Sequence, residues 1–506
     1  MSDVLSVLAS SLNDTQLAAA ARRLKNSTVN GGNRSAALTA LIELARSQKR
    51  MAVLICANAF DVARLNQEIA WLDPSLKVSS LPDWETLPYD TMSPHADLVS
   101  ERLETLYNLT SDDLQARPDV LIAAASTAAQ RFAPKSYVAG NTFFFRKGQT
   151  ISIGKLETSL VAAGYGRVEQ TMAPGEFAVR GGIVDIFPMG AATPLRLDLF
   201  DDEIDAIRRF DPESQRSTGS VDRVRILPGH EFAFDEESRN RFRAAWRAAF
   251  PGDPNKCPVY VDVGSGICSP GIEYYLPLFF ESTGTLADYL PDNALFITLG
   301  ETRDAIDSFM RQTQERYKFL SHDAQRPALP PEKLFDKADS FFDAIAPFGR
   351  ISLKAPETGI DTSLTIERSA KDPAAKLKDF VAKCRIEKKR ILIVATGSGR
   401  AARLQELLRD GVREPELVES FAAFVNGSEP LAIAVGPLSG GFVLEEPGLV
   451  IITESELYNT KAIIRRRGHN RTTNVEAIIR DVSELREGDP VVHAAHGVGR
   501  YHGLET

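Results

Sequence analysis

The sequence predicts a multi-domain α/β protein in which a small antiparallel-sheet (α+β) domain is inserted into an α/β domain of the nucleotide-binding type. Apolar runs at 51–57 and 119–125 are typical of buried strands, and helical patterns at 36–45 and 61–71 alternate with them. Strict alternation of leucine with charged residues at 195–199 predicts a half-buried strand of the inserted sheet.

The remaining elements of the first domain follow in chain order. Helices are expected at 12–24 and 98–109. Strand-like runs at 259–263 and 294–299 return the chain to the same domain. The predicted first domain therefore comprises residues 1–135 and 219–345, and the insertion comprises residues 136–218.

The inserted domain reads as a protein-binding sheet. Extended runs at 177–180 and 183–187 flank Gly181-Gly182, and the strand at 195–199 turns through Asp201-Asp202 into 203–210. Arginines on such strands can form charge-assisted pairs with the carboxylates of a partner. The alternative is that they are ordinary solvated strand residues.

A phosphate-binding loop is absent from the first domain. The motif G-x-x-x-x-G-K-[ST] supplies backbone amides, a lysine and a hydroxyl to a nucleotide. When its last two positions are placed on Arg34 and Ser35, Thr28 and Asn33 fall where the two glycines belong. We therefore expect a degenerate P-loop-type domain that binds no ATP. We also expect that this chain binds no cofactor and has no catalytic role.

Residues 346–460 form a further α/β domain, which carries a competing motif. A strand at 390–395 leads into Gly397-Ser398-Gly399, which fits the G-x-G-x-x-[GA] pattern, and Glu419 lies near the distance expected of a ribose-binding acid. This pattern leaves open an alternative function, a nucleotide- or dinucleotide-dependent enzyme. Strand-to-helix turns in general favour Gly and Ser, so the pattern is weakly specific.

Composition limits the partners and the compartment. The 506 residues hold 59 Lys and Arg against 68 Asp and Glu, a net charge of −9, so the chain as a whole does not attract DNA. Its four cysteines are scattered without a C-x-x-C pair, which indicates reduced thiols. The sequence has no signal peptide and no run of transmembrane length, and we expect a cytoplasmic protein without a membrane partner.

Four motifs together resemble a known family. They are Leu-Pro-Asp-Trp-Glu-Thr-Leu-Pro-Tyr-Asp from 81, Gly-Glu-Phe-x-x-Arg-Gly within 174–216, Gly-Ile-Glu-Tyr-Tyr-Leu-Pro-Leu-Phe-Phe at 271–280, and Val-Val-His-x-x-His-Gly-Val-Gly-Arg-Tyr from 491. This set resembles the UvrB-like N-terminal half of the bacterial transcription-repair coupling factors (Mfd). We expect Trp84 and Tyr89 in the first motif to be packing residues and His95 to be a loop residue.

The resemblance implies a function for the inserted sheet. In that family the domain docks onto UvrA, so this half would recruit UvrA and couple removal of stalled RNA polymerase to nucleotide excision repair. Matching the shared module residue by residue assigns UvrA binding to Arg167, Phe177, Arg180, Phe187 and Arg196. The UvrB version carries another arginine where this chain has Ala178, so part of its charge pattern is missing.

The end of the chain resembles a second binding module. A basic segment at 461–482, usually a solvated linker, leads through a predicted helix at 475–485 to residues 483–506. Those residues resemble the opening strands of the CarD-like β-barrel that binds the RNA polymerase β subunit. One or two strands cannot close a barrel, so this domain is expected to be truncated, and the family's ATP-dependent, DNA-binding motor to be missing. His493, His496 and His502 lack acid or cysteine ligands at metal spacing, and no metal is expected.

Overall fold

The computed structural model describes residues 27–30, 33–111, 116–354, 360, 364–366, 372–409, 414–445, 448–458, 490–493 and 497–500. The chain divides into two compact units, Met1–Ala462 and Ile463–Thr506, and each is described by itself.

The first domain is built on a parallel sheet with the strand order β1-β14-β13-β2-β4-β3. Its strands are β1 (Ser27–Asn30), β2 (Ala52–Cys56), β3 (Val78–Ser80), β4 (Val120–Ala124), β13 (Leu295–Leu299) and β14 (Gly349–Lys354). Both β2 and β4 are buried along their whole length, as expected when helices cover both faces of a parallel sheet. The predicted strands at 51–57, 119–125 and 294–299 are confirmed.

Helices cover the two faces of this sheet. Leucines of α3 (Arg34–Ser47) and α4 (Phe60–Leu72) pack with Leu54 and Ile122 on one face. On the other face, α5 (Ala96–Thr110) and α6 (Ala125–Ala128) pack with Val53 and Leu121. The predicted helices at 36–45, 61–71 and 98–109 are confirmed, whereas the helix predicted at 12–24 lies outside the described residues.

Two expectations for the second part of this domain are corrected. Residues 259–263 are not a strand but lie in a helix, α10, because Pro258 starts a helical turn and Val259 and Val263, four residues apart, are buried while Val261 between them is 43% exposed. The expected boundary at 345/346 falls before β14, which pairs with β13 and β1 and completes the sheet. The other elements of this part are α7 (Lys135–Gly140), α9 (Glu236–Ala249), η1 (Pro254–Lys256), α10 (Pro258–Gly264), η2 (Ile272–Phe279), η3 (Leu286–Tyr289), α11 (Thr302–Leu320), α12 (Pro331–Leu334) and α13 (Ala338–Ala344).

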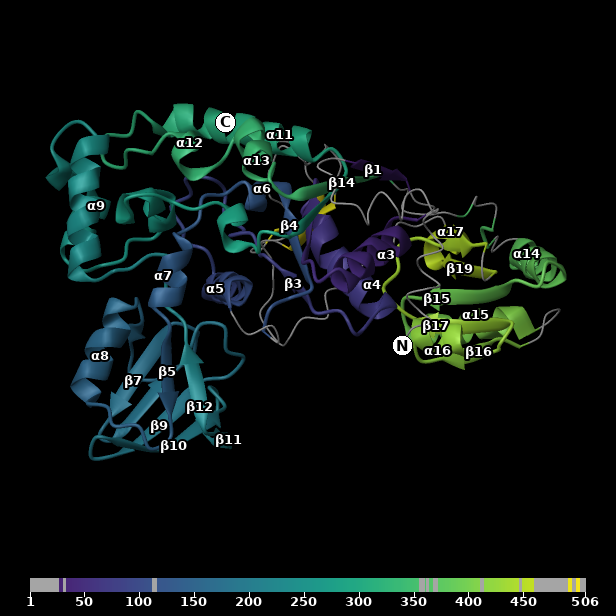
Figure 1. The fold of residues 1–506 in the computed structure, drawn as a ribbon, viewed down its shortest axis with the longest axis horizontal. Coiled ribbons are helices and arrows are strands. Elements are labelled where there is room, and N and C mark those ends of the chain that lie inside the picture. Colours follow the sequence, from purple (N-terminus) through teal and green to yellow (C-terminus); the bar gives the residue numbers. More distant parts are fainter. Residues whose placement is uncertain are drawn as a thin grey trace. The chain divides into compact units, whose positions relative to one another are not determined.

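The inserted domain contains a second sheet, with the order β11-β10-β9-β8-β7-β6. Its strands are β6 (Gly166–Arg167), β7 (Glu176–Arg180), β8 (Ile183–Ile186), β9 (Leu195–Phe200), β10 (Glu203–Phe210) and β11 (Ser217–Val221). Only the β6–β7 pair is parallel. The helix α8 (Ile153–Ala162) lies beside β7 and packs Leu156 and Leu160 into the core (Figure 1). A two-stranded sheet of β5 (Phe143–Arg146) and β12 (Arg223–Ile226) completes the domain, which thus extends past the expected end at residue 218.

The third domain contains a sheet with the order β16-β17-β15-β19-β18. Its strands are β15 (Arg390–Ala395), β16 (Glu416–Val418), β17 (Leu431–Val435), β18 (Phe442–Leu444) and β19 (Leu449–Thr453), and its helices are α14 (Ala375–Ile386), α15 (Ser398–Arg409), α16 (Phe421–Asn426) and α17 (Glu454–Tyr458). One face of this sheet shares a hydrophobic cluster with the first domain, since Ala36 and Leu72 pack with Val394 and Phe421. The third domain is therefore joined to the first through a common core.

The second unit contributes one antiparallel hairpin, in which β20 (Pro490–His493) pairs with β21 (Gly497–Arg500). The segment 461–482, the helix predicted at 475–485 and the side chains of His493, His496 and His502 lie outside what the structure describes. Across the described residues, no helix is both long and apolar enough to cross a membrane.

Candidate functional site

The sheet of β6–β11 has one apolar face and one charged face. Strand register places Ala178, Asp185, Arg196 and Arg208 in one row across β7, β8, β9 and β10. Side chains of paired residues lie on the same side of a sheet, so these residues share a face. We call this side, which also bears Arg180, the arginine face.

A buried carboxylate organises the arginine face. Asp185 is 1% exposed, and both of its oxygens accept hydrogen bonds from arginine. Arg196 donates from Nε to Oδ1 at 2.7 Å and from Nη2 to Oδ2 at 2.9 Å. Arg180 donates from Nη2 to Oδ2 at 3.0 Å. A single acidic residue thus fixes two of the arginines that the sequence predicts as contacts.

Arg196 is largely committed to contacts within the domain. Besides Asp185, its Nη1 donates to the Gln215 carbonyl at 3.4 Å, and its guanidinium lies 4.8 Å from the centre of the Phe210 ring. Hydrogen bonding to Asp185 raises the pKa of Arg196 above its ordinary value. With its side chain 18% exposed, Arg196 is placed to hold Asp185 rather than to reach a partner.

Arg180 is placed differently. Its side chain is 51% exposed, and its Nη2 reaches Asp185 and, at 3.4 Å, the Gln215 amide oxygen. Within the part of the chain that the structure describes, its Nε and Nη1 make no hydrogen bond. Arg180 therefore keeps N–H donors on Nε and Nη1 directed away from Asp185, where a carboxylate of a partner could accept from them.

Of the other three predicted residues, Arg167 and Phe177 do not lie on this face. Arg167 lies at the edge strand β6, is 61% exposed and pairs with Glu157 of α8 at 3.2 Å. Phe187 follows β8 and is 8% exposed. Phe177 has no exposed surface, because it lies on the apolar face with Val184 and Leu197. The ring of Phe177 therefore supports the sheet from its core side, and its contact with UvrA stays a prediction.

Sequence reasoning missed Asp185. The feature of the sequence that indicates its role is an acidic residue between Val184 and Ile186, on a strand whose other residues are apolar. A buried acid in such a strand requires a cationic partner, and Arg196 stands opposite it in register.

The region of the missing phosphate loop is filled by side chains. Asn33 caps α3 by accepting from the Ala36 amide at 3.0 Å, and Ser35 Oγ donates to the carboxylate of Glu68. Glu68, 0% exposed, also accepts from Arg64 and from the Ser439 amide of the third domain, both at 3.1 Å. A carboxylate thus occupies the hydroxyl that would help to hold Mg²⁺ and phosphate in a working loop.

The Gly397-Ser398-Gly399 turn also differs from a dinucleotide site. The buried carboxylate of Glu454 accepts from the Thr396 amide at 2.8 Å and pairs with Arg400, so an acid stands where a pyrophosphate would bring negative charge. A Cβ added at Gly397 or Gly399 would meet no atom within 4 Å, so neither glycine is needed for packing within the described part of the chain. Glu419 follows β16, which β17 separates from β15, whereas the ribose-binding acid of the dinucleotide fold follows the strand next to the first.

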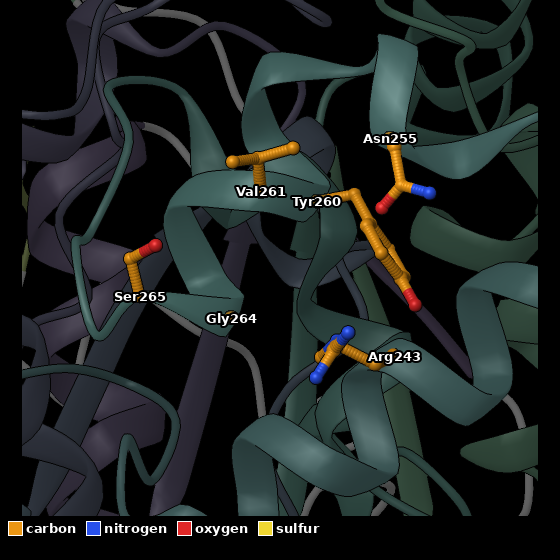
Figure 2. Close-up of a pocket in the computed structure, with 6 residues that line it drawn as sticks. All are labelled: Arg243, Asn255, Tyr260, Val261, Gly264 and Ser265. Atoms are coloured by element: carbon orange, nitrogen blue, oxygen red, sulfur yellow. The ribbon is translucent and has the colours of Figure 1, made fainter.

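A small hollow beside α10 offers little room for a cofactor. It encloses about 220 Å³ and is lined by Arg243, Asn255, Tyr260, Val261, Gly264 and Ser265 (Figure 2). The guanidinium of Arg243 lies 5.0 Å from the centre of the Tyr260 ring. Ligand pockets generally measure roughly 300–1,000 Å³, so this hollow is small for a nucleotide.

The other residues singled out in the sequence have structural roles. Trp84 and Tyr89 are buried, and their polar atoms bond to Glu231 and to the Leu329 carbonyl, which confirms the packing prediction. His95 caps α5 by accepting from the Asp97 amide at 3.3 Å. The four cysteines are free thiols.

Three domain-family profiles match this chain. They are described as the UvrB interaction domain, at residues 143–232, the MFD D3 domain, at 380–457, and the CarD-like/TRCF RID domain, at 485–506. Among similar proteins, the transcription-repair-coupling factor of Haemophilus influenzae is 35% identical over 92% of this chain and 41% of its own length. The factor of Escherichia coli K12 is 35% identical over 93% of this chain and 41% of its own length. The factor of Bacillus subtilis 168 is 26% identical over 96% of this chain and 42% of its own length.

Over more than nine tenths of its length, the chain is similar to the N-terminal part of transcription-repair coupling factors. It spans about two fifths of the length of the curated relatives that it matches. Of the three profiles, the UvrB interaction profile covers every strand of the arginine-face sheet together with β5 and β12. The MFD D3 profile covers most of the third domain, and the RID profile covers the β20–β21 hairpin.

Proposed function

We propose that this chain is the recruitment half of a transcription-repair coupling factor. Its arginine face docks UvrA and thereby couples the removal of stalled RNA polymerase to nucleotide excision repair. The observation that carries the proposal is Arg180, an exposed guanidinium held in place by a buried carboxylate within a domain that matches the UvrB interaction profile.

The residues have distinct roles in this proposal. Arg180 contacts a carboxylate of UvrA directly, and Arg167 adds a charge at the edge of the sheet. Arg196 orients Arg180 through Asp185, and Phe177 supports the sheet from its core side. Phe187, which follows β8, stays a predicted contact. Pre-oriented side chains lose less conformational entropy on binding, so a fixed guanidinium favours affinity.

The test is calorimetric titration of UvrA into the wild-type chain and into Arg180→Glu. Removing one member of a buried interfacial charge pair costs about 2–5 kcal/mol, and a reversal should lie at the upper end, a loss of roughly a thousandfold in affinity. Arg303→Glu is the matched control, because Arg303 on α11 is also 51% exposed and also pairs with an aspartate, Asp339. Equal affinity of wild type and a folded Arg180→Glu variant would place the docking face elsewhere.

We further propose that the chain hydrolyses no ATP and that the RNA polymerase β subunit is a second partner, reached through the complete CarD-like domain to which β20 and β21 belong. The carboxylates of Glu68 and Glu454 at the two candidate phosphate sites support the first statement. They also disfavour the alternative of a nucleotide- or dinucleotide-dependent enzyme. DNA contact belongs, in this proposal, to the motor of the full-length protein.

A further inference from the structure

An exposed aromatic ring lies on the arginine face. Arg196, Asp198 and Phe200 alternate along β9 and therefore share one face of the sheet. Phe200 is 77% exposed, although the side chains of Leu195 and Leu197 on the same strand are buried. A large apolar ring thus stands in solvent at the end of a charged row.

Strand register brings this ring to the same end of the sheet as Arg180. Ile183 pairs with Arg180 on one side and with Asp198 on the other. The turn at Gly181-Gly182 contacts β9 directly, because the Leu199 amide donates to the Gly182 carbonyl at 2.8 Å. A Cβ at Gly182 would lie 2.8 Å from the Leu199 oxygen, so only glycine allows this approach.

The hairpin that carries Phe200 is held on its second side. The Ile204 amide donates to the Gln149 carbonyl at 3.0 Å, and the Ile151 amide donates to the Asp202 carbonyl at 2.6 Å. Backbone fixed in this way presents Phe200 in one place. Burial of the ring by a partner therefore costs little conformational entropy, because the loop that carries Phe200 is already ordered.

The charges around the ring indicate the class of partner. Asp201 and Asp202 follow Phe200 directly, and Glu203 pairs with it across the turn. Three acids at the tip disfavour the dense, repeated phosphate charge of a nucleic acid or a lipid surface, whereas a single carboxylate of a protein partner is attracted by Arg180. A protein surface with an apolar recess beside a carboxylate fits both the ring and Arg180.

We propose that Phe200 is an apolar anchor that enters a recess on the same partner whose carboxylate pairs with Arg180. This inference rests on the proposed docking of UvrA and adds a second kind of contact to it. Aromatic and arginine side chains dominate the binding energy of protein interfaces, and they tend to cluster. Arg180 and Phe200 place both kinds of side chain at one end of the arginine face.

The experiment is calorimetric titration of UvrA into wild type, Phe200→Ala, Phe200→Leu and Arg180→Glu at several temperatures. Phe319→Ala is the matched control, because Phe319 is 89% exposed on α11. We expect Phe200→Ala to bind roughly tenfold to a hundredfold more weakly, Phe200→Leu to lie between it and wild type, and Phe319→Ala to match wild type. Loss of apolar burial should also make the heat-capacity change of binding less negative for Phe200→Ala.

The outcomes separate the two proposals. Full affinity of Phe200→Ala, while Arg180→Glu has lost binding, would overturn the anchor and leave the docking face intact. Failure of the wild-type chain to bind UvrA would overturn both. Equal melting temperatures of the variants, expected because Phe200 is mostly in solvent, establish that any loss of binding is not a loss of folding.

Discussion

Asp185 accepts two parallel hydrogen bonds from the guanidinium of Arg196, at 2.7 and 2.9 Å, in a setting where the carboxylate is 1% exposed. Breaking a buried pair by removing one partner leaves an uncompensated charge, which costs about 3–5 kcal/mol. The arginine face therefore depends on Arg196 for its stability, whereas Arg180 is the residue that we propose for binding.

The first prediction concerns this division. Arg196→Ala should lower the free energy of unfolding by about 3 kcal/mol, since Asp185 keeps only its bond to Arg180. Arg180→Ala should lower it by under about 1 kcal/mol, because that pair is half in solvent. Urea denaturation of both variants measures the difference. Equal destabilisation would mean that Arg180 is as structural as Arg196.

The second prediction concerns the junction of the first and third domains. A Cβ at Gly436 would lie 2.5 Å from the Trp71 indole, whose Nε1 donates to the Val435 carbonyl at 3.2 Å. Gly436→Ala should therefore cost about 1–3 kcal/mol through overpacking. Gly397→Ala, with no atom near the added Cβ, should stay within about 0.5 kcal/mol. Denaturant midpoints test both, and a harmless Gly436→Ala would show that the two domains do not pack through Trp71.

The third prediction is that ATP with Mg²⁺ leaves the melting temperature of the chain unchanged. A ligand at a hundred times its dissociation constant would stabilise the folded state by about 2.7 kcal/mol, a readily measured shift. Ser35 is bonded to Glu68 and Asn33 caps the helix, so the groups that bind phosphate are occupied. The melting temperature of Arg34→Lys, a variant that restores the lysine of the motif, should likewise not change with ATP and Mg²⁺. A shift that grows with ATP concentration would contradict this.

The fourth prediction concerns pH and two buried groups. Burial raises the pKa of Glu273 from 4.5 to about 7, so its stabilising effect is complete below pH 4.5 and is lost as the pH rises through 7. Burial lowers the pKa of His230 from 6.5 to about 4, so its stabilising effect is complete above pH 6.5 and is lost as the pH falls through 4. Between pH 4.5 and 6.5 the two contributions change in opposite directions, each by up to about 1.4 kcal/mol per pH unit.

Single variants separate these contributions. Relative to wild type, Glu273→Gln should gain stability as the pH rises from 4.5 to 7, because it no longer carries the raised pKa. His230→Phe, which can retain the stack on Phe232 at 5.2 Å, should gain relative to wild type as the pH falls from 6.5 to 4. Unfolding free energies across this range give both differences. Parallel curves for wild type and either variant would show that the group does not titrate as its burial implies.

Much of the local structure followed from the sequence. The apolar runs of β2, β4 and β13 and the alternation along β9 predicted strands that the structure contains, because burial on two faces or on one face leaves a period that can be read along the chain. The strand predicted at 259–263 was wrong, because a short apolar segment fits both the helical and the strand period. Pro258 and the packing of α10 favoured the helix.

The sequence by itself determined the order of domains, the loss of the phosphate loop and the presence of a charged strand face, because each depends on residue types at fixed spacing. Only the tertiary structure decided that Asp185 engages both Arg196 and Arg180, that Phe177 lies inside and that Phe200 lies at the same end of the sheet as Arg180. The physical reason is register. Alternation assigns each residue to one of two faces, but the pairing of β7, β8 and β9 decides which side chains meet on that face, and that pairing joins residues that are far apart in the chain.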